Sequence, residues 1–144
     1  MAYSSQADVQ VVAGGAARLR ELSDFENAGA IDPAVVEQAI THADAWIDTF
    51  VQMRFAVPLE TTPGAVNMLS ANEAIYQMRK WRGMATPEDD DDHEKRETLL
   101  TAFANGANVL GITPLPVKSE VVVDAQTDRP ADKAVRRCSL KGFW

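Results

Sequence analysis

The chain has 144 residues, enough for one domain, and its 46% hydrophobic and 24% charged composition argues against wholesale disorder. No run of roughly 18 apolar residues, as a membrane span needs, occurs in it. The first residues have neither a basic start nor an apolar stretch, so we expect no signal peptide. Cys138 is the one cysteine of the sequence and cannot form an intrachain disulfide. The net charge of −7 arises in residues 1–110, which hold 8 Lys/Arg against 17 Asp/Glu, and this acidic body disfavours non-specific binding to DNA phosphates.

The N-terminal half predicts two short helical pieces and one long helix. Ser4–Leu22 has helical spacing that Gly14-Gly15 should break in two, because glycine is costly inside helices. A loop over 23–31 follows. Asp32 as N-cap and Pro33 at the first helical position predict a central helix to Arg54 that ends before Pro58. Its apolar residues share one face, with Asp44 and Asp48 expected on the other side.

Two more proline-initiated helices follow. Thr62-Pro63 starts one that should end at Gly83, and Thr86-Pro87 starts one that should end at Asn105-Gly106. The acidic residues of the first turn after Pro87 complement the helix dipole. Short connections predict antiparallel neighbours. The residues expected in the core across these helices are Val36, Ile40, Ala43, Ile47, Phe50, Leu69, Leu99 and Phe103.

The C-terminal segment differs in character. Pro114 and Pro116 exclude a helix there, and 120–124 is a short β-prone run. We therefore expect an all-α fold: a small bundle of about four helices over 1–111, with an extended C-terminal tail over 112–144 that can add a short β-strand.

Two acidic motifs look like ion sites and are better explained otherwise. The loop from Asp24 has EF-hand-like acids, but Ala28 and Val35 stand where calcium ligands belong, so a capped turn is the better interpretation. The run 89–94 contains His93, but consecutive helical residues point around the axis, which favours a solvated acidic helix start. We predict no metal site.

No sequence pattern indicates catalysis. The phosphate-binding, dinucleotide-binding and nucleophile-elbow motifs are all lacking, and Cys138 has no nearby histidine. The run Arg79-Lys80-Trp81-Arg82 could touch nucleic acid, but it is also what the C-terminal end of a helix favours. We expect no enzyme activity and no cofactor.

The order of these features resembles the Mu-like phage head–tail adaptor proteins. The resemblance covers nearly the whole chain, with departures at 25–28 and 135–138. It includes the helix after Pro63, the acidic helix after Pro87, and Leu110-Gly111. The remaining matching elements are Tyr3–Asp8 with Gly14, Gly29-Ala-Ile-Asp32, Ala43-Asp-Ala-Trp-Ile-Asp48, Arg54-Phe-Ala-Val-Pro-Leu59 and Ser139-Leu-Lys-Gly-Phe143.

The resemblance implies a structural virion protein of the capsid–tail neck, present in the host cytoplasm during assembly. It implies a homo-oligomeric ring, commonly of twelve copies, beneath the portal protein and above a downstream tail or stopper protein, with DNA only as passing cargo and no membrane. The tail is expected to dock on the portal or on neighbouring copies. The apolar and basic residues expected to bind there are Val121, Val123, Arg136, Arg137, Leu140, Lys141, Phe143 and Trp144.

Two other functions fit parts of the sequence. A DNA-binding helical module of the packaging machinery, similar to a terminase, fits short helices joined by tight turns, but the chain lacks a basic recognition helix. A small metal-dependent hydrolase would need the acidic run 89–94 to converge on an ion.

Overall fold

The computed structural model describes residues 1–112 of the chain. These residues form five helices and no strand, which confirms an all-α bundle. The expected tail beyond residue 112, with its β-prone run, lies outside the described residues. No helix among the described residues combines the length and apolar character needed to cross a bilayer.

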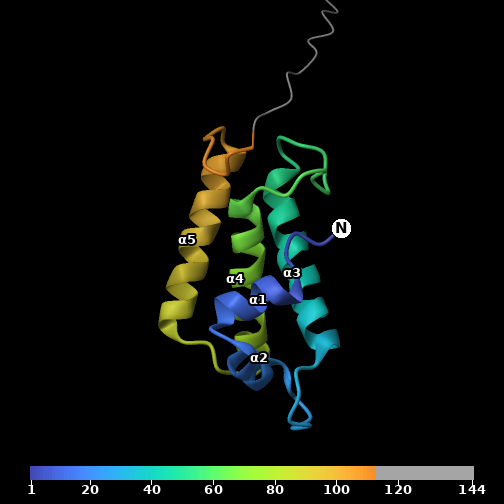
Figure 1. Cartoon of the computed structure of the whole chain (residues 1–144). Helices are drawn as coiled ribbons and strands as arrows, with labels where there is room; N and C mark the ends of the chain where they lie inside the picture. The colour runs from blue at the N-terminus through green and yellow to red at the C-terminus, as the bar shows by residue number, and fades with distance from the viewer. Residues whose placement is uncertain (113–144) are drawn as a thin grey trace, which may run out of the picture. The chain divides into compact units, whose positions relative to one another are not determined.

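Three long helices form the frame of the bundle. They are α3 (Pro33–Val51), α4 (Gly64–Trp81) and α5 (Pro87–Ala104), and consecutive members run antiparallel (Figure 1). The Asp32 side chain accepts from the Ala34 N–H to cap α3. Thr86 and Asp89 form a reciprocal capping box on α5. The start of α4 differs from the prediction, because Pro63 is itself the N-cap and no side chain caps the helix.

Two short helices cross the front of this frame (Figure 1). They are α1 (Gln6–Ala13) and α2 (Ala16–Ser23), and the expected break at Gly14-Gly15 separates them. Both glycines have positive φ, 89° and 123°, a backbone conformation that other residues rarely adopt. The chain can therefore turn sharply here, so that both short helices pack on the long ones.

The core has two clusters along the α3–α4 pair. The first includes Val36, Ile40 and Ala43, is covered by α1 and α2, and also contains Ala71, Ala74 and Met78 from α4. The second includes Ile47 and Phe103 and is completed by Tyr3, Val51, Leu59, Val66, Leu100 and Leu110, with Phe50 and Leu69 half-buried against it. All the expected core residues but one therefore lie in or against the core.

The exception is Leu99, which is 36% exposed and not in the core as expected. Residues 99 and 100 point about 100° apart on a helix. Since Leu100 and Phe103 are the only buried residues of α5, the helix presents a narrow apolar stripe inward. Leu99 is turned out of that stripe.

The end of α3 also differs from the prediction. The helix stops at Val51, three residues before Arg54, and continues as tightened turns in which the Arg54 N–H donates to the Val51 carbonyl at 3.0 Å. The Arg54 side chain then donates to the Phe103 carbonyl at 3.1 Å and lies over the Phe103 ring. Arg54 thereby ties the end of α3 to the end of α5.

Candidate interaction surface

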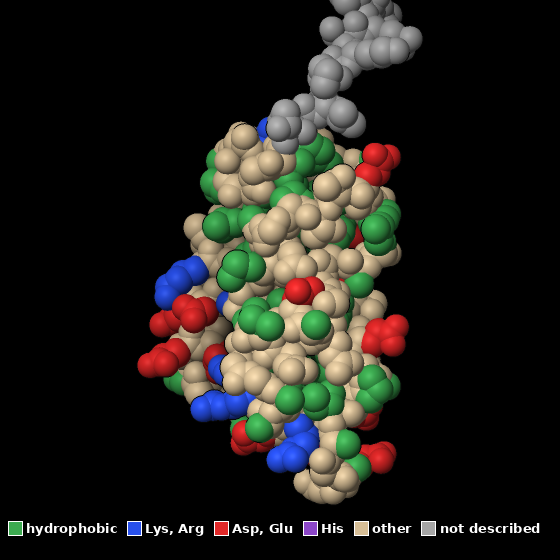
Figure 2. Space-filling model, in the orientation of Figure 1, with side chains coloured by type: hydrophobic (Ala, Val, Ile, Leu, Met, Phe, Trp, Pro, Cys, Tyr) green, Lys and Arg blue, Asp and Glu red, His purple; other side chains and the backbone are tan. Residues whose placement is uncertain are grey.

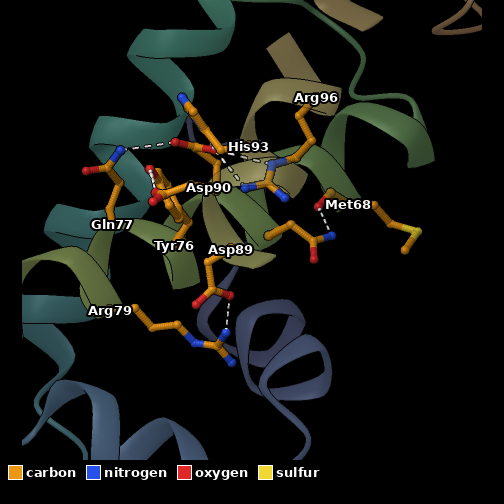
Figure 3. Close-up of polar contacts among 10 residues, drawn as sticks. Met68, Tyr76, Gln77, Arg79, Asp89, Asp90, His93 and Arg96 are labelled. Atoms are coloured by element: carbon orange, nitrogen blue, oxygen red, sulfur yellow. Dashed lines mark hydrogen bonds and ion pairs between the residues drawn. The ribbon is translucent and has the colours of Figure 1, made fainter. Parts of the chain in front are cut away.

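A buried carboxylate holds α5 against α4. Glu73 is fully buried, and its Oε2 lies 2.9 Å from His93 Nδ1 and 3.3 Å from both Nε and Nη2 of Arg96 (Figure 3). Gln77 Nε2 donates to the other oxygen at 3.0 Å. A buried charge is tolerated where it is paired and hydrogen-bonded, as here. The first three turns of α5, which bury no apolar side chain, are therefore docked by polar contacts.

Aromatic rings enclose this polar cluster. His93 stacks on Tyr76 with ring centroids 4.6 Å apart and lies 5.0 Å from the ring of Trp46. The Tyr76 hydroxyl donates to Asp90 at 2.7 Å, and burial together with this bond raises the pKa of Tyr76 to about 12. The rings hold His93 at the junction of α3, α4 and α5.

The acidic run of α5 is divided between two environments. Asp89 pairs with Arg79 and Asp90 faces Tyr76, so the start of α5 is not the uniformly solvated one that we expected (Figure 3). Burial acts to raise the pKa of Asp89, but the bonds from Thr86 and Arg79 outweigh it and lower that pKa. Asp91 and Glu94 remain exposed. Among residues 1–112, no three His, Cys, Asp or Glu side chains are grouped to hold a metal ion.

A charge-poor face lies where α4 begins and α5 ends. Residues 61–72 and 98–112 contain no charged side chain. Met68, Leu99 and Val109 are 59%, 36% and 45% exposed there, beside a groove of about 390 Å³. The groove is completed by Ala65, Leu69, Asn72, Asp92, Lys95, Arg96 and Leu110.

The rest of the surface carries more charged side chains than this face does. In Figure 2, charged side chains gather along the outer edge of α5 and at the lower end of the bundle, and acidic ones also stand along the opposite edge, whereas the rest of the upper end bears mainly uncharged side chains. Exposed apolar side chains with few charges are typical of the centre of a protein–protein interface. We therefore treat the charge-poor face, defined by Met68, Leu99 and Val109, as the candidate interaction surface.

A second polar network fixes the N-terminus to the bundle. The Tyr3 N–H donates to Asp44 at 2.9 Å, the Tyr3 hydroxyl donates to Asp48, and the Leu59 N–H donates to that hydroxyl at 3.1 Å. Ser70 donates to Asp44 at 2.6 Å. Asp44 is thus buried, although the helical spacing predicted that it lies on the side opposite the apolar face. Desolvation raises the pKa of Asp44 despite these bonds.

The tyrosines of this protein should resist ionisation. The chain contains two, Tyr3 and Tyr76, and burial followed by a bond to an aspartate raises the pKa of each to about 12. An unfolded tyrosine ionises near pH 10, so the stability that both contribute is present below that pH and is lost as pH rises toward 12. In an alkaline titration followed by tyrosinate absorbance, we expect no ionisation near pH 10 before the chain unfolds. A native chain that titrates a tyrosine with a pKa near 10 would contradict the burial of these hydroxyls.

The loop that resembles an EF-hand is a capped turn. The Asp24 carboxylate accepts from the Ala28 and Gly29 N–H groups, each at 2.7 Å, and the bond from Gly29 contributes most to lowering the pKa of Asp24. These bonds use both carboxylate oxygens within the turn. Arg82 donates to the Asp24 carbonyl and lies over the Phe25 ring.

The sequence-predicted binding residues of the tail all lie outside the described residues. They are Val121, Val123, Arg136, Arg137, Leu140, Lys141, Phe143 and Trp144, and Cys138 lies among them. Their docking stays a prediction.

Sequence reasoning did not identify the Glu73 cluster or the charge-poor face. A signal for the first exists, since Glu73 is the only charged residue between 61 and 78 and would be expected to need a partner. For the charge-poor face, the two charge-free segments are visible in the sequence. That these segments lie side by side is known only from the structure.

Comparisons with known proteins give a consistent result. The family model described as "Bacteriophage Mu, Gp36" matches residues 3–126. The "Mu-like prophage FluMu protein gp36" of Haemophilus influenzae is 30% identical over 95 residues. That alignment covers 66% of each protein, so the chain spans just under two thirds of the length of this relative.

Proposed function

The chain belongs to the bacteriophage Mu Gp36 family, and from this premise we propose that it is a structural protein of the virion that acts as a head–tail adaptor. In this role it forms a homo-oligomeric ring beneath the portal, joins the capsid to the tail and extends the conduit for DNA. The role is non-catalytic and needs no cofactor. Family membership supports the phage origin, and the adaptor role rests on the resemblance in motif order described above.

The charge-poor face is the structural observation that supports this proposal. A chain with net charge −7 and 24% charged residues leaves two charge-free segments side by side, with three large apolar side chains exposed on them. Leaving such surface in water is unfavourable by roughly 25 cal/mol per Å². An adaptor that binds a portal or a neighbouring copy would cover it.

An acidic ring suits a DNA conduit. Twelve copies would each carry a charge of −7, and acids that face the lumen would repel the phosphates of passing DNA. Weak contacts with DNA are needed because phosphate-binding groups would slow its passage.

The tail residues from Val121 to Trp144 are proposed to add further contacts with the portal, adjacent copies or the downstream neck protein. Arginine and aromatic side chains are enriched at binding hot spots. Repetition of a weak contact around a ring supplies avidity that a single tail lacks.

The experiment mixes the chain with its portal and measures the mass of the complex. Leu99→Lys should leave the free energy of unfolding within about 0.5 kcal/mol, because Leu99 is exposed, yet greatly weaken the complex. Removing residues 134–144 should likewise leave melting unchanged and reduce binding. Gln38→Lys, an exposed change of the same charge on α3, is the matched control and should bind as the intact chain does. An intact chain that forms no complex with the portal would overturn the adaptor role.

A further inference from the structure

Arginines gather around a cleft at the lower end of the bundle. The cleft has a volume of about 400 Å³, and Arg18 and Arg20 of α2 line it together with Arg82, which follows α4. Glu21, Asp24 and Asn27 complete it with Ala17. Three arginines face the two carboxylates of Glu21 and Asp24 here, so the cleft keeps a net positive charge.

The cleft has features of a binding surface. Arg82 lies over the Phe25 ring at 5.2 Å, and Phe25 is 43% exposed. Arg82 Nε is buried and has no hydrogen-bond partner among the described residues. Arg18 and Arg20 are exposed and belong to none of the ion pairs found in residues 1–112. Arginine and aromatic side chains are the types enriched at interfaces.

The same chain carries a complementary surface on α5. Asp91, Glu94 and Glu97 recur at every third residue, so they form a stripe along one side of the helix. All three are exposed, and none belongs to an ion pair of the described residues. Acidic side chains are visible along the outer edge of α5 in Figure 2.

We propose that the arginine cleft of one copy binds the acidic stripe of α5 on the next copy. This inference rests on the proposed ring. Because the two surfaces differ, the contact is head-to-tail, and repetition of such a contact closes into a ring when the rotation permits. Arginine can bind a carboxylate in a bidentate manner, which fixes orientation as well as charge. A second copy fits the cleft better than DNA does, because the described part of the chain is strongly acidic.

The contact is tested by reversing each surface separately. One variant carries Arg18→Glu and Arg20→Glu, and the other carries Asp91→Lys and Glu94→Lys. We expect the intact chain to self-associate in sedimentation at low salt, and each variant to lose that association by at least about tenfold because like charges then meet. An equimolar mixture of the two variants should regain it, since each reversed surface again finds its complement. Unchanged melting of each variant shows that the fold is kept.

The control is Glu37→Lys with Glu60→Lys, which changes the net charge as the second variant does but at exposed positions outside α5. It should associate as the intact chain does. An intact chain that stays monomeric, reversals that leave association unchanged, or a mixture that does not recover would each overturn the contact. Binding of DNA that requires Arg18 and Arg20, without self-association, would assign the cleft to DNA instead. If both charge-reversed variants still form complexes with the portal as the intact chain does, this contact is overturned while the adaptor role stands.

Discussion

Replacing Ile47 with aspartate is expected to lower the free energy of unfolding by about 4 kcal/mol or more, enough to unfold a domain of ordinary stability. Ile47 is fully buried on α3 and packs in the second core cluster with Phe103 and Leu100. The substitution removes a large apolar side chain and places a carboxylate where the described structure offers it no cation. Chemical denaturation followed by circular dichroism measures the change.

The control for this experiment is Gln38→Asp on the same helix. Gln38 is exposed, so the change should cost only the helix propensity of aspartate, about 0.5 kcal/mol. If Ile47→Asp unfolded at the same denaturant concentration as Gln38→Asp, then the inward face of α3 would be wrongly assigned.

Local signals predicted most of the helical framework. Asp32-Pro33 and Thr86-Pro87 start α3 and α5 as expected, because N-cap side chains and a first-turn proline act within a few residues. The break at Gly14-Gly15 was predictable for the same reason, since two residues with positive φ interrupt a helix without any help from the rest of the fold.

Features that depend on tertiary packing were not predictable in this way. Helical periodicity does not distinguish Leu99 from Leu100, because both lie near the apolar side of α5. The angle at which α5 docks decides that Leu100 faces the core. Helical spacing alone predicts that Asp44 lies on the side of α3 opposite the apolar face. The contact that helps to bury it comes from Tyr3, which is 41 residues away in sequence. The candidate surface is of this kind, because its two charge-free segments meet only after α4 and α5 pair.

The polar docking of α5 gives the second large effect. Arg96→Met should lower the free energy of unfolding by about 3 kcal/mol, because it leaves the fully buried Glu73 carboxylate without its arginine. Adding Glu73→Leu to that variant should recover part of the loss, although each substitution alone destabilises the chain. A buried ion pair replaced by apolar side chains of similar size is often nearly neutral, whereas removal of one partner is not.

A double-mutant cycle measured by chemical denaturation distinguishes this behaviour from simple packing loss. If the losses in the free energy of unfolding of the two single variants add up to that of the double variant, then Glu73 and Arg96 do not interact. Arg96 is partly accessible at the rim of the groove, whereas Glu73 is not, so the matched single variant Glu73→Leu should be the milder of the two. In the Glu73→Leu variant, the Arg96 side chain can turn toward solvent. In the Arg96→Met variant, the Glu73 carboxylate stays buried and cannot reach water. The polar cluster therefore stabilises the bundle chiefly by satisfying Glu73, and it holds α5 where Leu99 and the acidic stripe remain available to a partner.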